Sequence, residues 1–393
     1  MSSYSPWLDR FIHRHSPKVR RPPPEVLADG SLRILSPFQH GPSLSNYIGK
    51  FITRRKKALL VGVGYRATYG VQDVRWALPG AHTDVRVVKD WLTQKRGYRE
   101  QDIVVLSEDM SDPLLHPTKD NIIRELEAFT AGSRPGDHYF FLYTGHSGQR
   151  EVRSDSIKDD GAKKEEDNMD EYIIPCDAVA IESIVDDDGK KKKMVKIRED
   201  MTILDDDLNR LLVERLADTS QLVAVFDNCH SGTLLDLEHH RCNRVTSGYS
   251  RGRRFLRSTF EALTEQHEDE ADTVFNQLLT KISTRMVKKL NPMSRFCTGL
   301  CPRIRAGDGA LVICISACKD AENTYETPDG SSLTRIMIDI LDSHERTSYK
   351  QFMRRVVAEL NRLERQAKGK MGKQNPQISS KFPLLMAATF IWI

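Results

Sequence analysis

Short, largely apolar runs recur along the chain and predict buried strands. The first, at residues 58–63, reads Ala-Leu-Leu-Val-Gly-Val. Such runs are typical of parallel strands that are covered on both faces, because neither side of the sheet then meets water. The other predicted strands are Ile103–Leu106, Tyr139–Tyr143, Leu222–Phe226, Leu311–Ile315 and Phe382–Ile393.

Segments with a helical period lie between these runs. Within Thr83–Gln94, for example, Val85, Val88 and Trp91 fall on one face. Strands that alternate with helices predict an α/β fold, with a mostly parallel central sheet flanked by helices on both faces. The other predicted helices are 118–129, 203–216, 260–290, Leu333–Leu341 and Tyr349–Leu363.

Three segments do not follow this alternation. Seven of the 17 prolines lie in the first 50 residues, which predicts an extended arm. Residues 151–200 hold 16 acidic and 10 basic side chains, which predicts a long charged loop or a partly disordered insertion. We therefore expect an N-terminal arm (1–55), a first strand–helix region carrying the charged insertion (56–245), a basic and helical linker (246–308) and a second region that completes the same sheet (309–393).

The composition excludes some classes of protein. A net charge of +4, from 59 basic and 55 acidic residues, argues against a protein built to bind nucleic acid through overall positive charge. The mean hydropathy is −0.49 and no apolar run reaches 18 residues, so no membrane span is expected. Seven irregularly spaced cysteines and no apolar stretch in the first 21 residues favour a reducing compartment, cytoplasmic or nuclear.

Two predicted strands run directly into glycine-flanked His or Cys. Tyr139–Tyr143 is followed by Thr-Gly-His146-Ser-Gly, and Leu222–Phe226 by Asp-Asn-Cys229-His-Ser-Gly. Carboxyl ends of parallel strands share one edge of a sheet, where ligands usually bind. A neighbouring imidazole activates a cysteine thiol for attack on a carbonyl, and backbone N–H groups at Cys229 and Ser147 could stabilise the resulting oxyanion.

These two motifs resemble those of the metacaspases, caspase-like cysteine peptidases of fungi, plants and protists. Their order, and the charged segments between and after them, are similar to type I members, with a large-subunit-like part before a small-subunit-like part. The resemblance implies a caspase-like fold, a monomer, His146 as general base and Cys229 as nucleophile. Two positions depart from the family: Ser147 replaces the usual glycine, and Asn228 precedes the nucleophile.

The resemblance also implies a substrate preference and an activator. Metacaspases cut proteins after Arg or Lys, and their two pocket aspartates match Asp84 and Asp227. Asp84 could instead be a helix N-terminal charge. The calcium ligands of the family match Asp170, Asp205, Asp206 and Asp236, although helix capping by Asp205 is an alternative and no EF-hand pattern is present.

Other basic and cysteine-containing segments remain open to two interpretations. Arg251–Arg257 and Lys190–Lys193 are either solvated charge runs or sites of autoprocessing by a peptidase of this preference. Cys297-x3-Cys301 and Cys314-x3-Cys318 could form a four-thiolate zinc site, but Cys314 lies in a predicted strand and the spacing is unusual, so zinc is not expected. The main alternative function is a non-proteolytic protein of the same fold that binds clients or aggregates.

Overall fold

The chain is described from a computed structural model. The described residues are 25–26, 32–33, 54–65, 76–151, 169–185, 191–228, 234–243, 297, 301, 309–317, 332–344, 346–366 and 374–387. Contacts divide the chain into two units, Met1–Thr53 and Arg54–Ile393. In the first unit, the structure describes one antiparallel pair of short strands, β1 (Glu25–Val26) and β2 (Leu32–Arg33).

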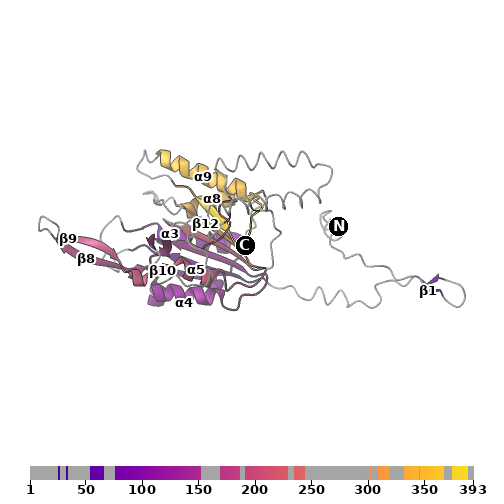
Figure 1. Cartoon of the computed structure of the whole chain (residues 1–393), viewed down its shortest axis with the longest axis horizontal. Coiled ribbons are helices and arrows are strands. Elements are labelled where there is room, and N and C mark those ends of the chain that lie inside the picture. The colour runs from indigo at the N-terminus through magenta and orange to yellow at the C-terminus, as the bar shows by residue number, and fades with distance from the viewer. Residues whose placement is uncertain are drawn as a thin grey trace. The chain divides into compact units, whose positions relative to one another are not determined.

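A six-stranded sheet forms the centre of the second unit, in the order β13-β12-β11-β5-β3-β4 (Figure 1). All pairings are parallel except that of β13 with β12. All seven residues of β5 are buried, because it lies inside the sheet and both of its faces are covered. The strands are β3 (Lys56–Gly62), β4 (Ile103–Ser107), β5 (His138–Thr144), β11 (Gln221–Asp227), β12 (Leu311–Ser316) and β13 (Gln377–Ser380).

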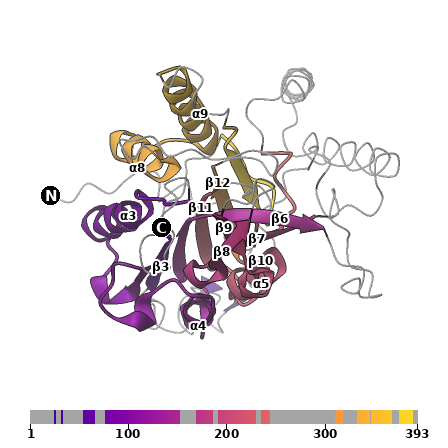
Figure 2. The same ribbon diagram turned by 90° about the vertical axis from the view of Figure 1, so that its left-hand side faces the viewer.

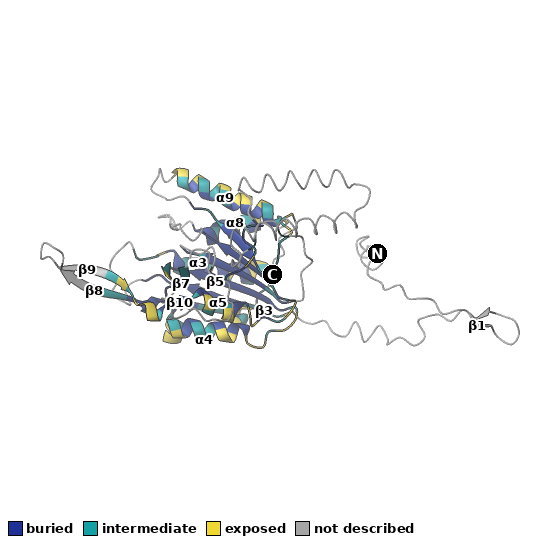
Figure 3. Ribbon diagram, in the orientation of Figure 1, coloured by how far each residue is buried: buried dark blue, intermediate teal, exposed yellow. Residues whose placement is uncertain are grey.

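Within the described part of the chain, five α-helices cover the two faces of this sheet (Figure 2). Successive side chains of β5 point to opposite faces of the sheet and so belong to different cores. Phe140 belongs to the core formed with α3, α8 and α9, and Phe141 to the core formed with α4 and α5. Figure 3, which is coloured by burial, shows the buried sheet between these two layers of helices. The helices are α3 (Ala81–Arg96), α4 (Lys119–Thr130), α5 (Asp205–Leu212), α8 (Leu333–Ser343) and α9 (Tyr349–Gln366).

The predicted α/β architecture is therefore confirmed, as are five of its strands and five of its helices. The helix ends follow local chemistry: the side chain of Thr118 caps α4 by accepting from the N–H of Asn121, and Ser332 caps α8 in the same way. The predicted helix at 260–290, the basic segment Arg251–Arg257 and most of the arm lie outside the described residues. No helix in the part of the chain that the structure describes is long and apolar enough to cross a membrane.

The prediction of a charged loop at 151–200 is wrong for the described residues in that range. They form strand β7 (Met169–Ile173) and an antiparallel hairpin of β8 (Val179–Val185) and β9 (Lys191–Ile197). The high charge count hid these strands, because their apolar residues are interspersed with polar and charged ones instead of forming a continuous run. β7 pairs with β6 (Ser147–Glu151) and β10 (Ile203–Leu204) in a small antiparallel sheet, and short 3-10 turns occur at Glu100–Asp102, Pro113–Leu115, Cys176–Ala178 and Glu199–Met201.

The predicted last strand, Phe382–Ile393, is also wrong over its described part. The final strand is β13, which ends at Ser380, and residues 381–387 contain no strand. Pro383 has no N–H to donate to a strand ladder, which disfavours a strand through the described residues 381–387. The strand that does form has a single large apolar residue, Ile378, and therefore lacks the apolar signal.

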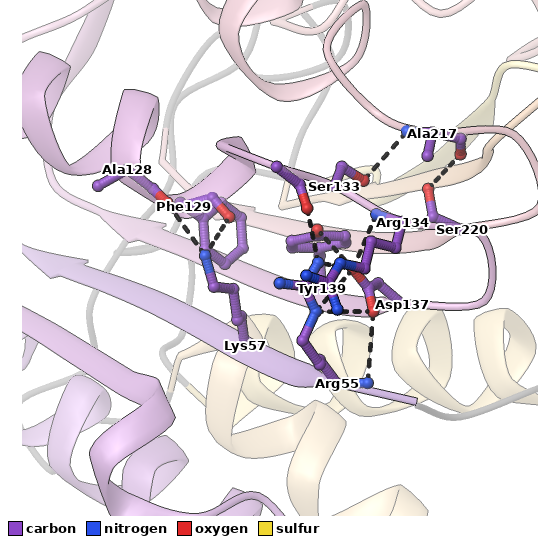
Figure 4. A network of polar contacts seen from close by, with 11 residues as sticks. Arg55, Lys57, Ala128, Phe129, Ser133, Arg134, Asp137, Tyr139, Ala217 and Ser220 are labelled. Carbon is purple, nitrogen blue, oxygen red and sulfur yellow. Dashed lines mark hydrogen bonds and ion pairs between the residues drawn. The ribbon is translucent and has the colours of Figure 1, made fainter. Parts of the chain in front are cut away.

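A polar network lies at the amino-terminal ends of β3 and β5 (Figure 4). The Nε atom of Arg55 lies 3.1 Å from both carboxylate oxygens of Asp137, whose Oδ2 also accepts from the N–H of Arg134 at 2.9 Å. Burial raises the pKa of Asp137, but Arg55 and the backbone N–H groups outweigh it and hold that pKa below its usual range. Lys57 donates to the carbonyls of Ala128 and Phe129 and so ties β3 to the end of α4.

We expect Asp137→Asn to lower the free energy of unfolding by on the order of 1–3 kcal/mol at pH 7. A carboxyl whose pKa is depressed by folding stabilises the protein above its unfolded pKa, and this contribution is lost as pH falls through the folded value. The difference between wild type and variant should therefore shrink below about pH 4 in denaturant titrations.

Glu182→Gln is the matched control for this substitution. Glu182 forms an exposed ion pair with Lys196, with side chains 47% and 56% exposed. Its loss should change the free energy of unfolding by less than about 0.5 kcal/mol. Equal effects of the two variants would show that the buried network contributes no more than a surface ion pair.

Candidate active site

The in-register sheet brings the two sequence motifs to one edge. Asp227, the last residue of β11, pairs with Thr144, the last residue of β5. His146 follows Thr144 by two residues, and Cys229 follows Asp227 by two residues on the adjacent parallel strand. Cys229 itself lies outside the described residues. Its neighbour Asn228 is fully buried.

The imidazole of His146 is held in one orientation and one tautomer. Its Nε2 atom lies 3.0 Å from the backbone carbonyl oxygen of Trp76. A carbonyl oxygen only accepts, so Nε2 carries the proton and Nδ1 is left with a free lone pair. The rings of Tyr65 and Trp76 contact the imidazole, with centroids 4.8 and 4.7 Å from its own.

Burial lowers the pKa of His146, with a smaller opposite effect from the hydrogen bond to Trp76. The lowered pKa keeps the ring neutral near pH 7. A neutral imidazole with Nδ1 available is the form that accepts a proton from a nucleophile. The ring is therefore in a protonation state that allows Nδ1 to accept a proton.

Two buried tyrosines position the backbone of His146. The hydroxyl of Tyr65 accepts from the N–H of His146 at 2.9 Å and donates to the carbonyl of Ile174 at 2.5 Å. The hydroxyl of Tyr143 lies 2.7 Å from the carbonyl oxygen of His146. Burial raises the pKa of both phenols, so that both remain protonated. A side chain at Gly145 is excluded, since a Cβ there would lie 2.6 Å from the hydroxyl of Tyr143.

Glu108 in turn positions Tyr65. Its two carboxylate oxygens accept from the backbone N–H groups of Gly64 and Tyr65, at 2.8 and 2.7 Å, and Oε2 lies 2.6 Å from Nε2 of His82. These contacts hold Tyr65 in the left-handed region, with a φ of 53°, which a bulky residue adopts only when its surroundings enforce it. The chain of contacts therefore runs from Glu108 through Tyr65 to His146.

None of these supporting residues was predicted from the sequence. Glu108 directly follows β4 at the same edge of the sheet, so the rule about strand ends is a signal that could have identified it. Trp76 contributes its backbone carbonyl to His146, and a carbonyl leaves no signal in the residue type.

The two predicted pocket aspartates are close enough to influence each other. Asp84 lies in the first turn of α3, is fully buried, and accepts from Nε of Arg335 at 3.1 Å. Burial, and next the charge of Asp227, raise the pKa of Asp84 to about 7. Asp227 is half-buried and accepts from both the N–H and the hydroxyl of Thr334, each at 2.8 Å.

The predicted oxyanion donor and calcium ligands are placed as follows. Ser147 begins β6 and pairs with Ile173. Asp205 and Asp236 come together, but their third partner is Glu171. Asp170, one residue before it, instead contacts Arg150, and Asp206 is exposed.

Three buried carboxylates form this acidic cluster, defined as Glu171, Asp205 and Asp236. One oxygen from each lies within 4.8 Å of the others. Burial raises the pKa of Asp205 to about 6, and Asp205 also accepts from the backbone N–H of Glu171 at 3.1 Å. Desolvated carboxylate oxygens at this spacing fit a hard divalent cation such as Ca²⁺, which prefers oxygen ligands.

Known proteins resemble this chain in sequence over most of its length. The family described as "Metacaspase, peptidase C14 domain" matches residues 56–201 and 194–238. Metacaspase-1 of Ajellomyces capsulatus is 28% identical over 402 residues, which cover 97% of this chain and 95% of that protein. Metacaspase-1 of Pyricularia oryzae is 35% identical over 204 residues, covering 51% and 43% of the two chains.

A solved structure with a related arrangement, Caspase-1 from Spodoptera frugiperda, is 8% identical, with a TM-score of 0.38 and coverage of 84% and 87%. That similarity is too low to add to the assignment, which depends on the family match and the relatives aligned over most of the chain. The expected family is thereby confirmed. The chain belongs to the metacaspases and is a caspase-like cysteine peptidase.

Proposed function

We propose that this metacaspase is a calcium-activated endopeptidase that cuts after Arg or Lys, with Cys229 as nucleophile and His146 as general base. The observation that carries the proposal is the contact between Nε2 of His146 and the carbonyl of Trp76. It leaves Nδ1 as the basic atom, on a strand end adjacent to the one that leads into Cys229.

In the proposed reaction, Nδ1 of His146 takes the proton of the Cys229 thiol, and the sulfur forms a bond to the scissile carbonyl carbon. The N–H groups of Ser147 and Cys229 stabilise the oxyanion. His146 then gives its proton to the leaving amine as the C–N bond breaks. A water molecule, deprotonated by His146, cleaves the thioester and restores the thiol.

The charge balance of Asp84 and Asp227 supports a basic P1 residue. The pair carries two carboxylates, and Arg335 supplies one guanidinium to Asp84. The hydrogen bonds described for Asp227 come from the neutral Thr334. A half-buried carboxylate whose described hydrogen-bond donors are all neutral favours an incoming cation, because ion pairing offsets its desolvation. In the alternative interpretation, the ion pair between Asp84 and Arg335 serves only to join α3 to α8. That interpretation explains Asp84 but gives no role to Asp227.

Autoprocessing is proposed at Arg251–Arg257 rather than at Lys190–Lys193. Peptidases bind their substrates as extended chains that must be accessible. Lys191–Lys193 are already paired with Ser183–Val185 in the β8–β9 hairpin, which would have to open before cleavage. Arg251–Arg257 lies outside the described residues and is chosen for its four arginines.

Peptide cleavage tests the proposal directly. With Ca²⁺ present, fluorogenic peptides ending in Arg or Lys should be cut at least about 100-fold faster than a peptide ending in Asp. Cys229→Ala should lose activity by about 10⁴-fold or more. In Asp84→Asn, kcat/KM for the Arg peptide should fall by about 100-fold, while Asp109→Asn, an exposed carboxylate beyond β4, should leave it unchanged.

The pH profile adds a second readout. Because the pKa of Asp84 is about 7, its ionised fraction, and with it kcat/KM for Arg peptides, should rise between pH 6 and 8. No turnover of any peptide with Ca²⁺ would contradict the peptidase assignment and favour the client-binding alternative. Faster cleavage after Asp than after Arg would contradict the pocket assignment alone.

Tyr65→Phe tests whether the positioning contacts matter for catalysis. It removes the hydroxyl that accepts from the N–H of His146 and keeps the ring. We expect kcat to fall by about 10- to 100-fold with KM nearly unchanged, because the imidazole loses its orientation rather than its affinity for substrate. Tyr98→Phe is the matched control, since its buried hydroxyl has no hydrogen bond among the described residues. Equal kinetics for the two variants would show that Tyr65 is only a packing residue.

The calcium dependence separates two ligand sets. If the acidic cluster binds Ca²⁺, Glu171→Gln and Asp205→Asn should each raise the Ca²⁺ concentration for half-maximal activity by about 10-fold or more. Asp170→Asn and Asp206→Asn, outside the cluster, should shift it by less than about threefold. Asp205 belongs to both ligand sets, so a larger shift in Asp170→Asn and Asp206→Asn than in Glu171→Gln would favour the set expected from the family resemblance. Full activity in chelator would exclude calcium activation.

A further inference from the structure

Four soft metal-ligating side chains converge outside the catalytic edge and the acidic cluster. They come from two segments, His239 and Cys242 after β11 and Cys297 and Cys301 before β12, and are named here the thiol–imidazole cluster. One ligand atom from each lies within 4.8 Å of all the others. Cys242 is buried and the other three are half-buried.

The distances within the cluster fit a single tetrahedral ion. Nδ1 of His239 lies 3.2 Å from Sγ of Cys301 and 3.7 Å from Sγ of Cys242. Ligand atoms at the corners of a tetrahedron around Zn²⁺, at about 2.3 Å for sulfur and about 2.1 Å for nitrogen, stand about 3.5–3.8 Å apart. The four atoms therefore already approximate the required arrangement.

Backbone contacts bring the two segments together independently of the thiols. The N–H of Cys297 donates to the carbonyl of Glu238 at 2.9 Å. The first segment is also attached to the edge strand β13, since the N–H of His239 donates to the carbonyl of Ser380, and the side chain of Asn243 donates to its hydroxyl. The convergence is thus part of the fold, although 54 residues (243–296) separate Cys242 from Cys297.

We propose that the thiol–imidazole cluster is a structural zinc site with three cysteine ligands and one histidine ligand. Thiolate and imidazole ligands select zinc over the hard cations that carboxylates bind. Four protein ligands fill the coordination shell, so the site is closed and stabilises structure rather than catalysing a reaction. A disulfide between two of the cysteines would explain neither the third thiol nor the imidazole.

The proposed site differs from the four-cysteine arrangement that the sequence suggests. Cys297 and Cys301 belong to the proposed site. Cys314 does not, because it is buried within strand β12, where burial raises the pKa of its thiol to about 12. Cys318 lies outside the described residues. The missing ligands are supplied by His239-x2-Cys242, a spacing close to that of many zinc sites.

Metal analysis of the full chain tests this proposal. All proteins should carry Cys229→Ala, so that the nucleophile contributes no thiolate, and be purified without chelators under reducing conditions. Inductively coupled plasma mass spectrometry should find about one zinc per chain. Replacement by Co²⁺ should give the visible absorption bands and sulfur-to-cobalt charge transfer of a tetrahedral, thiolate-rich site.

Two double variants distinguish the possible ligand sets. Cys297→Ala/Cys301→Ala should bind less than about 0.2 zinc per chain and unfold at a lower temperature, whereas Cys314→Ala/Cys318→Ala should keep its zinc. The proposal is overturned if the parent protein, which carries only Cys229→Ala, binds no zinc. It is also overturned if the first double variant retains zinc, or if peptide mapping of the parent protein finds a disulfide within the cluster. The cobalt spectrum of the parent protein decides the question even if a variant does not fold.

Discussion

The parallel, in-register pairing of β5 with β3 and β11 is the constraint on which the site depends. Gly62, Thr144 and Asp227 stand in one row at the ends of these three strands. Everything beyond that row leaves the sheet at a single edge. A slip of one residue in either pairing would displace a strand end by about 3.3 Å, which exceeds the tolerance of a hydrogen bond to a reacting group. The apolar residues of β5, packed on both faces, resist such a slip.

The sequence predicts those parts of the fold whose signal is local. Continuous apolar runs identified the five buried strands, since a strand covered on both faces has no polar positions to confuse the pattern. The strands β9 and β13 were missed because they contain no such continuous apolar run. β9 has lysine at four of its seven positions, and β13 has a single apolar residue among four, so neither carries the apolar signal. Their positions depend on partners that are distant in the sequence.

The same distinction applies to the site. Residue type and position pointed to His146, because strand ends can be recognised in a sequence, whereas Asp84 and Asp227 were expected from the family resemblance. The orientation of the imidazole was not predictable, since it depends on the carbonyl of Trp76 and on hydroxyl contacts from Tyr65 across the sheet. The acidic cluster shows a further limit. Glu171 and Asp170 are adjacent on β7, and the pairing of that strand decides which of them faces Asp205.

The proposed zinc site would join the two ends of the linker between the two halves of the sheet through metal–ligand bonds. His239 and Cys242 stand before the linker and Cys297 and Cys301 after it, so a bound metal would close residues 243–296 into a ring. Cutting one bond in a ring opens it without separating the two sides. If the peptidase cleaves its own linker at Arg251–Arg257, the resulting fragments would remain bridged by metal–ligand bonds as well as by the pairing of β11 with β12. Processing would then free the new chain ends while leaving the sheet intact.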